Sequence, residues 1–220
     1  MRAIDLITDE IPPLMHTDTG EKALSWMEEF KVSHLPVLKS GNFVGVVSEA
    51  MLFDQRDLSL SLDNLFQHLP RPFSYDGDHI YQVLSHISEY KLSLIPILDK
   101  NEQYVGCSDV HHLLTLIANT GSIKEIGGIL VVEMSSSDYS MAQIGQIVES
   151  NDAKILSAYL MSSSDSTNIE VTIKINTLDL DRIISTFERY DYVIKASFQK
   201  SRSADDLQFR YDALLNYLNL

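Results

Sequence analysis

Apolar and polar positions alternate between two kinds of spacing, one typical of helices and one typical of strands, over the first 118 residues of the chain. Apolar side chains at helical spacing occur twice, and each set is followed by two short apolar segments separated by a turn, HLPVLKSGNFVGVV from His34 and LIPILDKNEQYVGC from Leu94. This pattern predicts a helix and then a β-hairpin, in two successive copies. The helical positions are Ala23, Leu24, Met27 and Phe30 in one copy and Ile80, Val83, Leu84, Ile87 and Tyr90 in the other.

The two copies align as an internal repeat. Pro36 corresponds to Pro96 at an offset of 60 residues, and Gly45 corresponds to Gly106 at an offset of 61, so the one extra residue falls in the turn. Each copy begins with an extended segment marked by proline, DEIPPLMHTD and HLPRPFSYDG. We therefore expect one α/β unit at residues 1–58 and a second at residues 59–120. In each unit the proline precedes the second strand and the glycine opens the third.

After Asn119 the pattern changes to a second kind of domain. Strand-like segments ILVVEM, KILSAYLM, NIEVTIKIN and YVIKASFQ alternate with two helical segments, one presenting Met141, Ile144, Ile147 and Val148 on a single face. The order βαββαβ predicts a ferredoxin-like α+β domain at residues 126–200, with both helices on one face of an antiparallel sheet.

The C-terminal segment has its own apolar stripe. Leu207, Tyr211, Leu214 and Leu218 recur at helical spacing, which predicts an amphipathic helix over residues 203–220. We expect this helix to pack on its own protein or on a twin subunit; the alternative is that it docks a different protein.

Composition and charge restrict the function classes. The 220 residues are 45% hydrophobic, enough for packed cores, and 17 Lys and Arg against 31 Asp and Glu give a net charge of −14. Both halves of the chain are acidic, which disfavours binding to nucleic acid or to an anionic membrane. No apolar run approaches the roughly 18 residues that a membrane span needs, and the N-terminus has no leader pattern. We expect a cytoplasmic protein.

Catalytic and metal motifs are absent from the sequence. His111 and His112 are adjacent and point in different directions on a helix, and the other five histidines, at positions 16, 34, 68, 79 and 86, have no metal-ligand spacing. There is no glycine-rich phosphate loop and no nucleophile elbow. We therefore expect neither an enzyme nor a metal site. The single cysteine, Cys107, is interpreted as a packed strand residue, with a reactive thiol as the alternative.

The repeated unit, with its paired prolines and glycines, resembles the CBS domain, and two copies in tandem resemble the CBS pair, or Bateman module. The βαββαβ segment resembles the ACT domain, on element order and on Asp138 after its first strand. A CBS pair followed by an ACT-like domain resembles the AcuB type of acetoin-utilisation regulatory proteins. The expected fold class is α/β plus α+β, with the C-terminal amphipathic helix at the end.

The CBS resemblance implies a cleft between the repeats for an adenosine-containing ligand such as AMP, ATP or S-adenosylmethionine. The family pattern places a hydroxyl three residues after the glycine and a ribose-binding carboxylate three residues later. Here those positions hold Ser48 and Met51 in the first copy and Asp109 and His112 in the second. Both ribose carboxylates are missing.

These departures give the two clefts different expected chemistry. Ser48 can donate to a phosphate, whereas the thioether of Met51 is a weak acceptor. Asp109 would repel phosphate, which a protonated His112 could offset. The alternative is that both clefts are packed shut, with Met51 in a core. The candidate nucleotide-binding residues are Thr8, His34, Pro36, Ser48, Met51, Pro96, Asp109 and His112.

The ACT resemblance implies an amino-acid site after the first strand of that domain, with Asp138 and Met141 as candidates. In this chain Met141 occupies the place where a glycine would admit the ligand. The resulting expectation is a non-catalytic ligand-sensing regulator that forms at least a homodimer and acts through its oligomeric state or an unidentified protein partner. The alternative is a structural dimerisation adaptor whose ligand clefts have degenerated.

Overall fold

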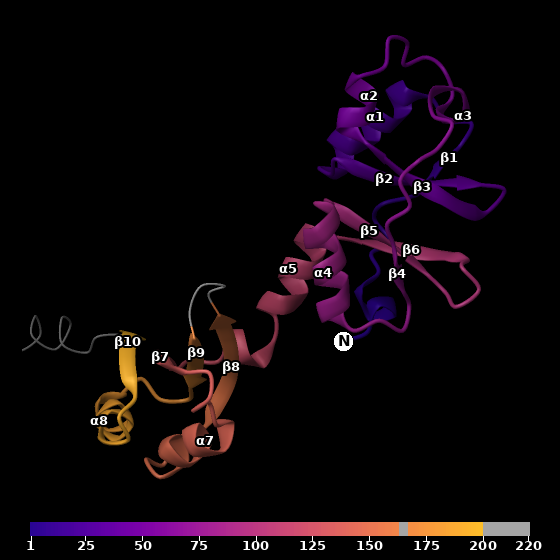
Figure 1. The fold of residues 1–220 in the computed structure, drawn as a ribbon. Helices are drawn as coiled ribbons and strands as arrows, with labels where there is room; N and C mark the ends of the chain where they lie inside the picture. Colours follow the sequence, from indigo (N-terminus) through magenta and orange to yellow (C-terminus); the bar gives the residue numbers. More distant parts are fainter. Residues whose placement is uncertain (163–166, 200–220) are drawn as a thin grey trace, which may run out of the picture. The chain divides into compact units, whose positions relative to one another are not determined.

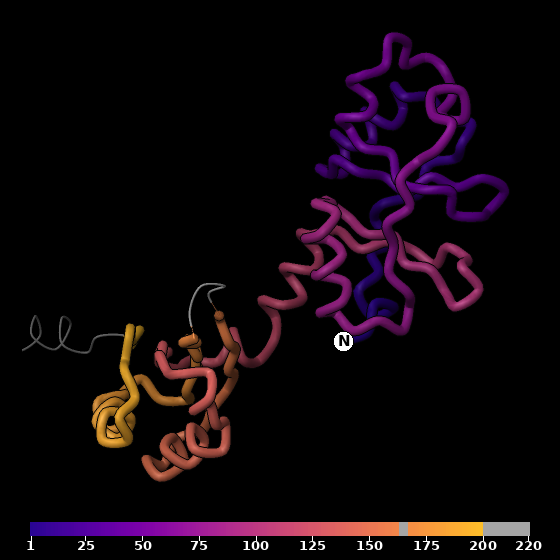
Figure 2. The backbone as a smooth tube through the Cα atoms, in the orientation of Figure 1, coloured from indigo at the N-terminus to yellow at the C-terminus, as the bar shows by residue number. Residues whose placement is uncertain are grey.

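The computed structural model describes residues 1–162 and 167–199. The chain divides into two compact units between Ala118 and Asn119, and the course of the backbone through each unit can be followed in Figure 2. The predicted helix at residues 203–220 lies outside the described residues.

The first copy of the repeat holds a three-stranded sheet in the order β1-β2-β3 (Figure 1). Strand β1 runs parallel to β2, with Leu14 opposite Val37, and β2 and β3 form the predicted antiparallel hairpin. The elements of this copy are η1 (Ala3–Leu6), β1 (Leu14–Met15), α1 (Gly20–Phe30), β2 (His34–Lys39), β3 (Asn42–Ser48) and α2 (Glu49–Phe53).

The second copy repeats this arrangement with a sheet in the order β4-β5-β6. Ser74 of β4 lies opposite Ile97 of the parallel strand β5, and β5 pairs with β6 in antiparallel fashion. Its elements are α3 (Leu62–Leu65), β4 (Ser74–Tyr75), α4 (Ile80–Tyr90), β5 (Leu94–Leu98), β6 (Tyr104–Asp109) and α5 (Val110–Ala118). The two copies therefore have the same fold.

The prolines and glycines of the repeat lie inside their strands, so their predicted places at strand boundaries were wrong. Pro36 faces Val46 across the hairpin, and the Val46 N–H donates to the Pro70 carbonyl at 2.8 Å, away from β2. Residues 36 and 46 are thus a non-hydrogen-bonded pair, so no N–H of residue 36 is needed to bond with β3. On its other side, β1 pairs with β2 only at residues 37 and 38. A proline is tolerated there for this reason.

Each copy contributes its leading segment to the core of the other copy. Ala3 and Leu6 of η1 are buried with Ile80 and Val83 of α4, and the Ala3 N–H donates to the Asp78 carbonyl at 2.8 Å. Figure 1 shows the N-terminus beside the second copy. In the same way, Leu62 of α3 is buried in the core of the first copy, and its N–H donates to the Asp18 carbonyl at 2.8 Å.

The two repeat glycines let these leading segments cross the third strand of each sheet. A Cβ at Gly45 would lie 2.5 Å from Leu69 Cβ, and a Cβ at Gly106 would lie 2.6 Å from Ile7 Cγ2. Any side chain at these positions would push the crossing segment away.

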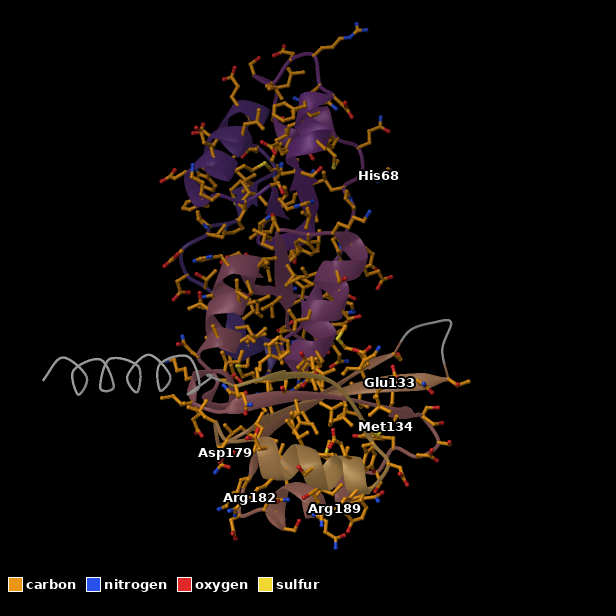
Figure 3. All side chains as sticks on the ribbon, turned by 90° about the vertical axis from the view of Figure 1, so that its left-hand side faces the viewer. His68, Glu133, Met134, Asp179, Arg182 and Arg189 are labelled. Carbon is orange, nitrogen blue, oxygen red and sulfur yellow. The ribbon has the colours of Figure 1, made fainter. Side chains whose placement is uncertain are left out.

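The second unit is a ferredoxin-like sandwich. Its antiparallel sheet has the strand order β10-β7-β9-β8, and α7 and α8 pack on one face through buried residues that include Ile144 and Phe187. On β7, Met134 is in this core, whereas Glu133 is on the other face and accepts from Lys195 at 2.9 Å (Figure 3). The elements are α6 (Gly121–Lys124), β7 (Gly128–Ser135), α7 (Met141–Glu149), β8 (Ile155–Ser162), β9 (Asn168–Ile175), α8 (Asp181–Arg189) and β10 (Val193–Phe198).

The predicted fold class is therefore confirmed for the described residues: two α/β units of the same fold are followed by a ferredoxin-like α+β domain. One detail of the pattern was wrong. Met141 was expected on the buried face of α7, but it is the first residue of that helix and is 40% exposed. Its place in the first turn, directly after the capping residue Ser140, leaves it outside the core.

Candidate functional site

A cavity of about 310 Å³ lies beside the β2–β3 hairpin of the first copy. It combines four polar side chains with an apolar wall, and both copies of the repeat contribute to it. The lining residues are His34, Val46, Ser48, Pro70, Arg71, Pro72, Tyr90 and Leu92. The first cleft is thus open in this structure, which argues against the alternative that it is packed shut.

His34 is held in one tautomer by the second copy. The Ser93 backbone N–H donates to His34 Nδ1 at 3.2 Å, and the Ser93 hydroxyl lies 3.1 Å from the same nitrogen. Because Nδ1 must accept, the ring proton of the neutral imidazole is on Nε2. Burial lowers the pKa of His34 below its ordinary value. His34 therefore presents a neutral ring with one N–H donor.

Ser48 ends β3 and caps helix α2. Its Oγ accepts from the Met51 backbone N–H at 3.2 Å, which fixes the oxygen at the start of the helix. A hydroxyl that accepts one hydrogen bond still has its own proton to donate. Ser48 can therefore donate to an anionic group in the cavity, as its place in the sequence pattern predicted.

Arg71 supplies the cation of the cavity. Its guanidinium is 5.7 Å from the ring centre of Phe43 and 5.5 Å from that of Phe73, and one nitrogen donates to Glu102 at 2.8 Å. These contacts hold the side chain in place while leaving other N–H groups unused, because a guanidinium has five donors. The site can therefore neutralise a phosphate or carboxylate.

Sequence reasoning missed Arg71 and Tyr90. Arg71 stands between two prolines in the segment that leads into the second copy, and this segment crosses the hairpin of the first copy at Gly45. The signal was present, since the proline-marked segment was recognised, but its crossing to the other copy was not foreseen. Tyr90 was assigned to the buried face of its helix, whereas it is 52% exposed and lines the cavity.

The other candidates in the first copy lie beside the cavity. Neither Met51 nor Pro36 is a lining residue. Met51 is half-buried on α2 and outside the apolar cores, so its expected alternative place in a core is wrong. Pro36 contributes through the strand pairing that sets Val46 opposite it.

The remaining nucleotide candidates gather around β6 of the second copy. The Thr8 N–H donates to the Cys107 carbonyl at 2.9 Å, and Pro96 lies opposite Cys107 in the hairpin. Asp109 Oδ1 accepts from the His112 N–H at 2.9 Å, as Ser48 does from Met51 in the first copy. The carboxylate of Asp109 therefore has a local structural role as a helix cap.

The two candidates in the second unit lie at the turn after β7. Asp138 is exposed and accepts from the Ser137 hydroxyl at 3.2 Å, and Met141 begins the next helix. Both residues stay candidates from the sequence.

Other chemistry is limited by what the described residues offer. Across residues 1–162 and 167–199, no group of three or more His, Cys, Asp and Glu side chains is placed to hold a metal ion. Every helix in those ranges is too short or too polar to span a bilayer. Cys107 is fully buried, and burial raises the pKa of its thiol to about 11, which favours the packed residue over the reactive thiol.

Comparisons with known proteins agree with the CBS fold. Residues 3–56 match the family model of the CBS domain. No curated protein sequence matches the chain. A CBS domain pair/ACT domain protein from Thermotoga maritima is 25% identical, with a TM-score of 0.48, and the match covers 53% of this chain and 96% of that one.

Two further solved structures are similar over about half of this chain. A protein assigned to acetoin utilization (AcuB) from Vibrio cholerae is 18% identical, with a TM-score of 0.47 and coverage of 54% of this chain and 91% of that one. CBSX2, solved in complex with AMP, is 19% identical, with a TM-score of 0.45 and coverage of 53% and 95%. The predicted resemblance to the CBS domain is confirmed by the match of residues 3–56 to the family model.

Proposed function

We propose that this chain is a non-catalytic ligand sensor that binds an adenosine-containing nucleotide in the cavity beside His34 and Ser48. AMP, ATP and S-adenosylmethionine are the candidates. CBS domains are regulatory ligand-sensing modules, and the observation that carries the proposal is the arrangement of the cavity itself. It is open, is lined by residues of both repeats, and combines hydrogen-bond donors with apolar side chains.

The phosphate end of the ligand would bind to Ser48 and Arg71. Ser48 has a free hydroxyl proton, and Arg71 has unused N–H donors beside its contact with Glu102. Charge-assisted hydrogen bonds of this kind are the stronger ones in proteins. Pro70, Pro72 and Leu92 give an apolar surface on which a purine can pack.

The CBS resemblance makes the ribose end the weak point of the site, because position 51, which lies beside the cavity, holds a thioether where a family member has a carboxylate that accepts from the ribose hydroxyls. A hydrogen bond to a charged group contributes about 1.5–3 kcal/mol. Its loss weakens binding roughly ten- to a hundredfold. We therefore expect the wild-type protein to bind AMP or ATP weakly, and Met51→Asp to bind more tightly.

Titration calorimetry with AMP, ATP and S-adenosylmethionine tests this function. Arg71→Met should weaken binding of the phosphate-bearing ligands by about ten- to a hundredfold. Arg56→Met removes an exposed arginine of the first copy outside the cavity and should leave affinity unchanged. If folded Met51→Asp and wild-type proteins both give no heat with all three ligands, the structural-adaptor alternative is favoured.

The output of binding would pass through association, since neither unit carries catalytic chemistry that we can identify in the described residues. We propose a homodimer at least, acting on an unidentified protein partner or through a change in oligomeric state. Sedimentation velocity at micromolar concentration, with and without nucleotide, tests this part. A monomer under both conditions would contradict it.

A further inference from the structure

A second cavity lies on a different part of the first copy, apart from the nucleotide site. Its volume is about 280 Å³, and it is lined by five polar and five apolar side chains. They are His16, Lys39, Asp63, Gln67 and His68, with Val37, Val44, Leu62, Phe66 and Leu69. His68 lies on the segment between α3 and β4 (Figure 3). None of these residues lines the first cavity.

The polar side of this cavity carries one charge of each sign. Lys39 Nζ donates to both carboxylate oxygens of Asp63, at 2.9 and 3.1 Å, and the two side chains are 49% and 50% exposed. This hydrogen bond lowers the pKa of Asp63, so its carboxylate is ionised at neutral pH. Such an exposed pair adds little to the stability of a fold. Stability alone therefore gives little reason for it to be here.

The third polar group, His16, is not satisfied by the protein. Its Nδ1 is buried and has no hydrogen-bond partner among the described residues, and it lies 3.7 Å from Asp63 Oδ2, beyond hydrogen-bond distance. Buried nitrogens of this kind are rare in proteins, and each calls for an explanation. The ring of His16 lines the cavity, so a bound ligand would meet it as the third polar group beside Lys39 and Asp63.

The internal repeat shows that the fold does not require these side chains. The Asp63 N–H donates to the His16 carbonyl at 2.9 Å, and at the matching place in the second copy the Ile4 N–H donates to the Asp76 carbonyl at 3.1 Å. The backbone interaction is thus the same with different side chains. At the offset of 60 residues, Asp99 stands where the first copy has Lys39. The histidine, cation and carboxylate are therefore particular to the first copy.

We propose that this cavity binds a free α-amino acid with an apolar side chain. The α-carboxylate would pair with Lys39 and the α-ammonium with Asp63, while the side chain would lie against Val44, Leu62 and Phe66. A zwitterion matches the two opposite charges without leaving either one unpaired.

Both charged groups have the capacity for this ligand while they stay paired. A lysine ammonium has three donors and a carboxylate has about four acceptor sites, so the contacts between Lys39 and Asp63 leave room on each. The volume of 280 Å³ is just below the roughly 300–1,000 Å³ of pockets for drug-sized ligands, as suits a small metabolite. The α-ammonium would also bring N–H donors to the side of Asp63 on which His16 lies.

Titration calorimetry with L-leucine, L-valine and L-phenylalanine tests the proposal on the full chain. At least one of them should bind. For that amino acid, the matched compounds that lack one charge should bind at least about tenfold more weakly: for leucine, these are isocaproate, without the ammonium, and L-leucinol, without the carboxylate. If isocaproate binds as tightly as leucine, the pairing of the α-ammonium with Asp63 is overturned. If L-leucinol binds as tightly, the pairing of the α-carboxylate with Lys39 is overturned.

Variants place the site. Lys39→Met and Asp63→Asn should each weaken binding at least about tenfold, while Lys100→Met, in the matching hairpin of the second copy, should not. Circular dichroism checks that each variant is folded. The proposal is overturned if no amino acid binds the folded wild-type protein, or if binding is the same in Lys39→Met. Because Arg71→Met leaves this cavity untouched, its effect on AMP separates the two sites.

Discussion

Gly45→Ala tests whether the crossing of the leading segment over β3 holds the first unit together. A Cβ at this position would lie 2.5 Å from Leu69 Cβ and 2.7 Å from the Pro70 carbonyl oxygen, and the residue has a φ of +154° that L side chains rarely adopt. Overpacking of this kind costs about 1–3 kcal/mol, and a strained backbone costs about 1–3 kcal/mol more. We expect a loss of about 2–6 kcal/mol in the free energy of unfolding of this unit.

Urea denaturation followed by tryptophan fluorescence measures this loss in the right unit. Trp26 is the only tryptophan of the chain and packs against the core of the first copy. With a typical urea slope of about 1–3 kcal/mol per molar, the midpoint should fall by about 1 M or more. Gly77→Ala is the matched control, because a Cβ there meets nothing within 4 Å and the backbone is not strained. If the two variants unfold at the same urea concentration, the close crossing is not what stabilises this unit.

Two further predictions concern His34 and Asp109. Burial lowers the pKa of His34 in the folded state, so the contribution of His34 to stability is complete above the unfolded pKa of about 6.5 and is lost as the pH falls through the folded pKa. In His34→Asn, the side-chain oxygen can accept from Ser93 without titrating, so the urea midpoint should fall less between neutral and acidic pH than it does in the wild type. An equal fall in the midpoint of both proteins would contradict this prediction. Asp109→Ala should lower the free energy of unfolding by about 0.5–2 kcal/mol, because helix α5 loses its cap. Asp109→Ser should keep most of the stability, because serine can also cap the helix. Thermal melts compare the two variants, and equal losses of stability would argue against the cap.

The spacing of apolar residues along the sequence was sufficient to predict most of the fold. The hairpins, the helices and the βαββαβ order follow from short-range apolar spacing, which the side chains of a single element determine. Positions at the ends of elements were less predictable: Met141 and Tyr90 continue an apolar stripe in sequence but lie on exposed helix ends. At an end there is no further turn of the neighbouring element to cover the side chain.

The candidate site was predicted only in part, because five of its eight lining residues lie outside the β2–β3 hairpin and are distant from it in sequence. His34 and Ser48 were found through the resemblance to the CBS domain, and both line the cavity. Arg71 reaches it from the segment between α3 and β4, and Leu92 reaches it from the connection between α4 and β5. Ser93 fixes the tautomer of His34 across the two copies. No periodic pattern in one copy carries information about a contact with the other copy.

The exchange of leading segments also limits how the repeat can exist on its own. With η1 in the second core and α3 in the first, a single copy cut out at the sequence boundary would leave one core without its last buried side chains. Two such single copies could fill the gap only if each inserted its leading segment into the core of the other. The duplicated chain thus contains within one polypeptide an exchange that a lone repeat would have to make as a domain-swapped dimer.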